Sequence, residues 1–212
     1  MRLLLVRNAE HVGYAVQRWP EDDTGLSDRG LEQSKHLASH LADESIVCVF
    51  ASPATRAVET VRYIAEKHRH SVQQTIAFKA LDMGECTGLS YDETRKAIGD
   101  AAWDEVFRSP QENTRYFKNG ETLAELADRS RDGLDQVVSE YGRDDGAVAI
   151  VGTHEEVIGV LLCKMTGMPL SRLWWWGGRL LPPLYASITE VLWKNGQWTL
   201  VHFGCTKHLE ES

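Results

Sequence analysis

Short apolar runs alternate along the chain with longer segments in which apolar residues recur at helical spacing. The runs Leu3–Val6, Ile46–Phe50 and Val148–Val151 have strand length, and each stops abruptly at polar residues. Continuous apolar runs of this kind are typical of strands buried on both faces of a parallel sheet. Because helical patterns follow all three, the chain is predicted to form an α/β three-layer sandwich, with a mainly parallel sheet and helices on both faces.

Four amphipathic segments are predicted to form the helices that cover this sheet. They begin at Ser27, which suits a helix N-cap, after Ser52-Pro53, at Glu121, and after His154. In each, apolar residues recur at intervals of three or four, as expected for a helix that buries one side. The helix from Glu121 is predicted to be the longest and to end near Tyr141.

The last part of the chain has a different pattern. Residues 186–194 and 197–203 flank Asn195-Gly196, a dipeptide that suits a tight type I′ turn. An antiparallel hairpin is therefore predicted at one side of the sheet.

Residues 84–120 also depart from the strand–helix alternation, and they hold only short helical patterns at 91–98 and 101–107. We predict that this segment forms a small cap over a pocket. The 212 residues are too few to suggest two full domains, so a single domain with an inserted cap is expected.

Composition narrows the possible partners and locations. The net charge of -8 argues against a protein that holds nucleic acid or an anionic membrane by its overall field. No apolar run approaches the roughly 18 residues needed to span a bilayer. The chain starts directly with a strand-like run rather than a leader with a cleavage site, so a cytoplasmic location is expected.

The four cysteines are widely spaced and show no paired metal-ligand spacing. Two of them, Cys48 and Cys163, lie within apolar runs, where a free thiol behaves as a small core residue. We therefore expect no disulfides, no metal site and no cofactor.

Polar residues follow the three predicted parallel strands, at the edge of the sheet where ligands of open α/β folds usually bind. These residues are Arg7, Asn8, Glu10 and His11 after the first strand, Ser52 and Arg56 after the second, and His154, Glu155 and Glu156 after the third. Two guanidiniums and an imidazole beside helix N-termini would bind an anion. Alternatively, the arginines form surface ion pairs and His154 caps a helix.

A resemblance to a known family favours the anion site. Leu5–Glu10 is similar to the L-x-R-H-G-E motif of the histidine phosphatase superfamily, which includes the cofactor-dependent phosphoglycerate mutases. Ser52–Thr60 is similar to its S-P-x-x-R-A-x-x-T segment. Further similar segments follow the family order: Leu26–Gln33, Leu81–Gly88, Gly120–Thr122, Ala149–His154, Leu181-Pro182 and Ala186–Thr189. The resemblance implies a phosphoglycerate-mutase-like fold.

The resemblance also implies roles for individual residues. In the family, the histidine of the first motif becomes phosphorylated, and two arginines and a second histidine hold the phosphoryl group. By position, Arg7, Arg56 and His154 are expected to bind the anion. Asn8 stands where the family has its nucleophile, so ordinary phosphatase turnover is expected to be close to absent.

Other departures from the family affect acid–base chemistry and charge. Ala80 stands at the position expected for the proton donor, and Asp82 or Glu85 is a possible substitute near the start of the cap. Glu155 and Glu156 stand where the family commonly has Gly-Gly, so two carboxylates are expected beside the anion. Their repulsion should weaken phosphate binding, and a Glu155 ion pair with the arginines would count against an anionic ligand.

Three functions remain open. In the first, the pocket is repurposed for lyase, isomerase or cyclase chemistry on a phosphate- or carboxylate-bearing small molecule, and His154 acts with Glu155, Glu156, Glu10 or His11. In the second, the chain is a pseudophosphatase that binds an anionic metabolite or a partner. In the third, it is a phosphatase or mutase with a substitute nucleophile, His11 or Cys86.

Trp174-Trp175-Trp176 is the remaining unusual motif, because three consecutive indoles cannot all face one side of a helix or strand. Core packing with one exposed indole is the simpler interpretation. A wall of the pocket or a contact in a homodimer is the alternative.

Overall fold

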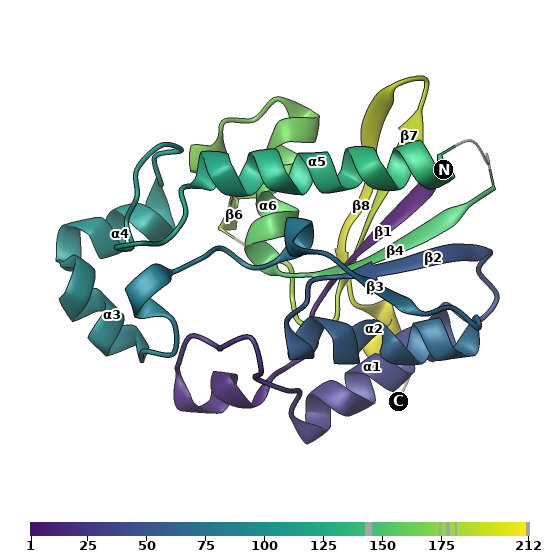
Figure 1. The fold of residues 1–212 in the computed structure, drawn as a ribbon, viewed down its shortest axis with the longest axis horizontal. Coiled ribbons are helices and arrows are strands. Elements are labelled where there is room, and N and C mark those ends of the chain that lie inside the picture. The colour runs from purple at the N-terminus through teal and green to yellow at the C-terminus, as the bar shows by residue number, and fades with distance from the viewer. Residues whose placement is uncertain (143–145, 174, 177–178, 181, 211–212) are drawn as a thin grey trace.

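The computed structural model describes residues 1–142, 146–173, 175–176, 179–180 and 182–210. Its centre is a six-stranded sheet in the order β3-β2-β4-β1-β7-β8 (Figure 1). The parallel strands are β1 (Arg2–Arg7), β2 (Ile46–Ala51), β3 (Val72–Gln74) and β4 (Val148–Thr153). The hairpin of β7 (Ile188–Lys194) and β8 (Gln197–Cys205) pairs antiparallel to β1. A separate two-stranded sheet joins β5 (Trp175–Trp176) to β6 (Arg179–Leu180).

Helices cover both faces of the large sheet (Figure 1). One face is covered by α1 (Asp28–His40) and α2 (Thr55–Lys67), and the other by α5 (Leu123–Tyr141) and α6 (Glu155–Thr166). Alternate residues of β1 supply the two cores. Leu3 and Leu5 belong to the core under α5 and α6, whereas Leu4 and Val6 belong to the core under α1 and α2. The predicted three-layer α/β architecture is confirmed.

Residues 84–120, for which we keep the name cap, carry α3 (Tyr91–Ile98) and α4 (Asp100–Arg108). These helices extend away from the sheet (Figure 1). A small apolar cluster joins Val106 of α4 to Met83, Cys86 and Phe117, and Trp19 packs against it. Short 3-10 helices complete the described chain: η1 (Val12–Val16), η2 (Ile76–Phe78), η3 (Gly84–Cys86), η4 (Leu170–Arg172) and η5 (Lys207–Leu209).

Two features differ from the sequence prediction. The long helix begins at Leu123 because Thr122 is its N-cap: the Thr122 side chain accepts from the Glu125 amide, and the Glu125 carboxylate accepts from the Thr122 amide. Strand β3 was not predicted, because its Val-Gln-Gln sequence is too short and too polar to show a strand pattern.

The described part of the chain bears on three further expectations. None of its helices is both long and apolar enough to cross a membrane. All four cysteines are free thiols. Trp174 lies outside the described residues, and Trp175 and Trp176 form β5, so the proposed roles of these indoles and the homodimer stay predictions.

Hydrogen bonds and close packing at the start of α1 fix the position of the segment that follows β1 and leads to the pocket. The Ser27 amide and hydroxyl both donate to the Glu10 carbonyl, at 3.0 and 3.3 Å. Gly30 lies so close to Glu10 that an added Cβ would overlap the Glu10 carbonyl oxygen. The close approach of α1 to the residues after Asn8 therefore depends on a glycine at position 30.

We expect Gly30→Ala to destabilise the protein by about 1–3 kcal/mol, despite alanine's better helix propensity, because the methyl group has no space. Urea denaturation measures the change. Ser39→Ala, at an exposed position of the same helix, is the control and should change stability by less than about 0.5 kcal/mol. Equal stability of Gly30→Ala and wild type would show that α1 can move away from Glu10.

Candidate functional site

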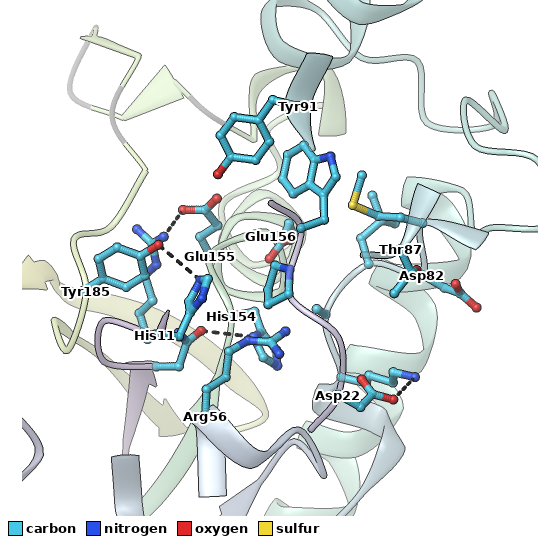
Figure 2. Close-up of a pocket in the computed structure, with 18 residues that line it drawn as sticks. His11, Asp22, Arg56, Asp82, Thr87, Tyr91, His154, Glu155, Glu156 and Tyr185 are labelled. Carbon is cyan, nitrogen blue, oxygen red and sulfur yellow. Dashed lines mark hydrogen bonds and ion pairs between the residues drawn. The ribbon is translucent and has the colours of Figure 1, made fainter. Parts of the chain in front are cut away.

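The register of the parallel strands brings three polar segments to one edge of the sheet. Arg7 is paired with Thr153 across β1 and β4, and Ala51 is paired with Gly152 across β2 and β4. The next residues of the three strands, Asn8, His154 and Ser52, therefore meet at the same edge. A pocket of about 150 Å³ opens there, lined by Asn8 and His154 among others (Figure 2).

A hydrogen-bond network forms the floor of this pocket. His154 Nδ1 lies 3.1 Å from Asn8 Oδ1, and His154 Nε2 lies 2.9 Å from Ser52 Oγ. Burial, together with Arg56 and Arg7, lowers the pKa of His154 well below its usual value, so the ring is neutral. Because Asn8 Oδ1 can only accept, the network assigns the proton to Nδ1, and Nε2 accepts from Ser52. Both ring nitrogens of His154 are thus already engaged.

The two arginines have different surroundings. Arg7 Nη2 lies 2.6 Å from Glu155 Oε2, Arg7 Nη1 donates to the Pro183 carbonyl, and the guanidinium lies 4.1 Å from the centre of the Tyr185 ring. Arg56 is 3% exposed and donates from Nη1 to the Glu21 carbonyl at 2.9 Å. Within the described residues, no carboxylate oxygen comes within 4.0 Å of the Arg56 guanidinium.

Glu155 and Glu156 form the first turn of α6, where the positive end of the helix dipole stabilises negative charge. Their side chains enter the pocket (Figure 2). Burial and the neighbouring Glu155 raise the pKa of Glu156 to about 7. Glu155 is paired with Arg7, whereas no side chain in the described part of the chain forms an ion pair or hydrogen bond with the Glu156 carboxyl, which interacts with its own backbone amide. The ion pair predicted to count against an anionic ligand is therefore present at Arg7.

His11 is a second neutral imidazole in the pocket wall. Burial, with Arg56 and Arg7 nearby, lowers the pKa of His11 to about 4. Its Nε2 lies 3.4 Å from the Tyr185 hydroxyl, and its buried Nδ1 has no hydrogen-bond partner among the residues that the structure describes. His11 thus presents an unprotonated ring near two guanidiniums at neutral pH.

Three other candidate residues from the sequence, Glu10, Glu85 and Asp82, lie outside the pocket or in its wall. Glu10 does not line the pocket, because it accepts from Ser27 Oγ at 2.9 Å at the start of α1. Glu85 also lies outside and pairs with Lys118 at 2.9 Å. Asp82 does line the pocket and accepts from the Gly84 amide at 2.8 Å.

Ala80 and Cys86 complete the comparison with the sequence-based candidates. Ala80 lines the pocket and brings no ionisable group to it. Cys86 is buried in the apolar cluster of the cap, and burial raises the pKa of its thiol. A raised thiol pKa lowers the thiolate fraction, so the surroundings of Cys86 do not favour it as a nucleophile.

Sequence reasoning missed the aromatic side of the pocket. Trp19, Tyr91 and Tyr185 all line it, and the rings of Trp19 and Tyr91 are 4.6 Å apart. They come from a loop, from the first residue of α3 and from the segment before β7. These positions carry no motif and show no periodicity, so only the folded chain brings them together.

Backbone contacts join the Trp19 loop to the cap. The Trp19 amide donates to the Leu89 carbonyl at 3.0 Å, and the Tyr91 amide donates to the Gln17 carbonyl, also at 3.0 Å. Trp19 Nε1 donates to Thr94 Oγ1 at 2.9 Å. The two pocket-lining aromatics, Trp19 and Tyr91, therefore lie on segments fixed to one another.

A sequence model of the histidine phosphatase superfamily (branch 1) matches residues 3–206. The chain belongs to this superfamily. Phosphoserine phosphatase 1 of Hydrogenobacter thermophilus is 28% identical over 180 residues, covering 84% of this chain and 82% of that protein. A probable phosphoglycerate mutase of Erwinia tasmaniensis is 25% identical over 218 residues, covering 100% and 96%.

Solved structures share the fold. Phosphoglycerate mutase of Bacillus anthracis superposes with a TM-score of 0.85 at 20% identity, covering 100% of this chain and 96% of that one. A histidine-to-alanine mutant of phosphoserine phosphatase from Entamoeba histolytica, in complex with phosphoserine, superposes with a TM-score of 0.80 at 19% identity, covering 98% of each chain. The predicted phosphoglycerate-mutase-like fold is thus confirmed.

The names of these relatives also bear on the expected chemistry. The relatives from Hydrogenobacter thermophilus and Erwinia tasmaniensis are named as a phosphatase and a probable mutase, which favours this chemistry over the lyase, isomerase or cyclase reaction considered from the sequence. They do not test whether this chain lacks its family's nucleophile. That assignment to Asn8 stays a prediction.

Glu156→Gln tests the surroundings of the pocket carboxyls. Folding raises the pKa of Glu156 from 4.5 to about 7. The folded protein therefore has its full stability, with respect to this carboxyl, below pH 4.5, and it loses stability as the pH rises through 7 and the buried carboxyl ionises. The variant should therefore gain stability over wild type at pH 8, by roughly 1–3 kcal/mol, and not at pH 4.5.

Urea denaturation at both pH values measures this difference. Glu112→Gln, at an exposed position outside the pocket, is the control and should show no such change. A Glu156→Gln stability difference that is the same at both pH values would contradict the assigned surroundings.

Proposed function

We propose that this chain binds a small anionic molecule in the pocket and does not transfer a phosphoryl group through residue 8. The observation that carries the proposal is that Asn8 lines the pocket together with Arg7, Arg56 and His154, with Asn8 Oδ1 3.1 Å from His154 Nδ1. The resemblance to the family implies a nucleophilic histidine at position 8. An amide nitrogen is a poor nucleophile, since its lone pair is delocalised into the carbonyl group. The Asn8 amide nitrogen is also engaged, donating to the Ala9 carbonyl at 2.9 Å.

Anion binding remains chemically reasonable without that histidine. Arg56 lines the pocket and is buried; its guanidinium donates to the Glu21 carbonyl and has no close carboxylate among the described residues. The related phosphoserine phosphatase with a histidine replaced by alanine was crystallised with phosphoserine, which supports ligand binding by this fold after loss of a histidine. Arg56 is therefore the principal anion contact in this proposal.

Glu155 sets the strength of this binding. Its carboxylate occupies one side of the Arg7 guanidinium at 2.6 Å, with the geometry that a ligand oxygen would need. An incoming anion must displace Glu155 from Arg7 or bind to Arg56 beside a negative charge. We therefore infer that simple anions bind weakly. The ion pair between Arg7 and Glu155 favours ligands that can displace Glu155 or bind to Arg56 beside its negative charge.

Calorimetric titration with inorganic phosphate tests the binding site. Wild type should bind in the millimolar range, Glu155→Gln should bind about tenfold more tightly, and Arg56→Met should bind at least about tenfold more weakly. Methionine keeps much of the apolar volume of the arginine stem. Glu112→Gln is the control with unchanged affinity. Phosphate binding to neither wild type nor Glu155→Gln would contradict the proposal.

A phosphatase or mutase that uses His11 is a second candidate, and the neutral pocket-facing ring of His11 favours it. In this reaction, a His11 nitrogen attacks phosphorus and the bond from phosphorus to the leaving oxygen breaks. Glu156, with its pKa raised to about 7, donates a proton to that oxygen. Water then attacks the phosphohistidine and releases phosphate. The phosphatases and mutases among the relatives support this candidate.

Hydrolysis of p-nitrophenyl phosphate, phosphoserine and 3-phosphoglycerate separates the two candidates. Under the binding proposal, purified wild type shows no more turnover than Arg56→Met prepared identically, because a missing nucleophile can cost on the order of 10⁶ in rate. Turnover that Arg56→Met abolishes would contradict it. His11→Asn then decides the route: loss of both turnover and a phosphorylated protein mass would support His11 as the nucleophile.

A further inference from the structure

The pocket has no overall positive charge, although a site for a simple anion would benefit from one. Its cationic side chains are Arg7, Arg56 and Lys79, and its carboxyl side chains are Asp22, Asp82, Glu155 and Glu156. Two internal pairs neutralise four of these groups: Arg7 with Glu155 at 2.6 Å, and Lys79 with Asp22 at 2.7 Å. The charged groups left for a ligand are therefore the Arg56 guanidinium and the carboxyls of Glu156 and Asp82.

Glu156 is the carboxyl most in need of a partner. Among the described residues, no side chain forms a hydrogen bond with it, and Glu155 lies next to it in the first turn of α6. A polar group in a pocket wall without a partner lowers stability unless a ligand or water satisfies it. A cation or a strong hydrogen-bond donor on the ligand would satisfy Glu156 and relieve its repulsion with Glu155.

Aromatic rings accompany these carboxyls. Tyr91 and Trp19 line the same pocket as Glu155 and Glu156, and the two carboxyl side chains lie between Tyr91 and Arg56 in the view of Figure 2. Hydrogen bonds hold Trp19 in place, whereas the Tyr185 ring already contacts the Arg7 guanidinium. Aromatic faces beside carboxylates attract ammonium groups through both charge and the ring quadrupole. This side of the pocket is suited to an organic cation.

We propose that the ligand is a small molecule that carries an acidic group and an ammonium group, with the acid at Arg56 and the ammonium at Glu156, in the pocket that Trp19 and Tyr91 also line. This inference rests on the proposed function and names the ligand class of the same site. The cavity of about 150 Å³ limits the ligand to the size of a few waters or one small ring before it extends into solvent. Short amino phosphates and amino acids fit this limit.

Two probes that differ only by the ammonium group test the inference. Calorimetric titration should show O-phosphoethanolamine binding wild type about tenfold more tightly than ethyl phosphate does. Glu156→Gln should reduce this preference to about twofold or less, mainly by weakening O-phosphoethanolamine. Glu156→Asp, which keeps the charge, should retain most of the preference. Glu112→Gln should behave as wild type.

The possible results separate this inference from the function on which it rests. Equal binding of the two probes to wild type overturns the ammonium site and leaves anion binding intact. Binding of neither probe overturns both proposals. A preference that survives in a folded Glu156→Gln variant overturns the assignment to Glu156. If that variant fails to fold by circular dichroism, the wild-type comparison and Glu156→Asp still decide the ammonium site.

Discussion

The parallel alignment of β1, β2 and β4 is the constraint on which the site depends. Strand β4 lies between the other two, and all six of its residues are buried. Its apolar side chains must face the cores on both sides of the sheet, so its register with β1 and β2 has little freedom. Because that register is set by packing, Asn8, Ser52 and His154 meet without any requirement for a ligand. The packing of the core therefore fixes the position of this pocket independently of which polar residues line it.

Much of the fold could be predicted because hydrophobic burial leaves a periodic record in the sequence. The long helices, the buried strands and the turn at Asn195-Gly196 agree closely with that record. The sequence pattern did not predict strand β3, because three residues at the edge of a sheet need little apolar surface. Capping at Thr122 moved one helix start by two residues from its predicted position, since side-chain hydrogen bonds decide helix ends.

The candidate site was predictable only in part. Polar residues at the ends of buried strands could be expected at one edge of the sheet, and Arg7 and His154 do line the pocket there, because the sheet fixes them. Glu10, only two residues beyond Asn8, has already turned toward α1. Trp19 and Tyr91 could not have been found, because contacts between distant loops leave no local pattern. The inner part of the site is thus determined by the sheet, and its outer wall by tertiary packing.

The hydrogen bonds between the Trp19 loop and the cap have a mechanical consequence. Residues 17–19 and 89–91 hold one another by their backbones, so neither can move far without the other. The His11 segment continues directly into this loop through η1. A displacement of α3 away from the sheet would therefore carry Trp19 and Tyr91 with it and pull on His11. Arg56 and His154 would keep their positions, because the elements that carry them pack on the sheet. The part of the pocket that they line would then separate from the part that Trp19 and Tyr91 line.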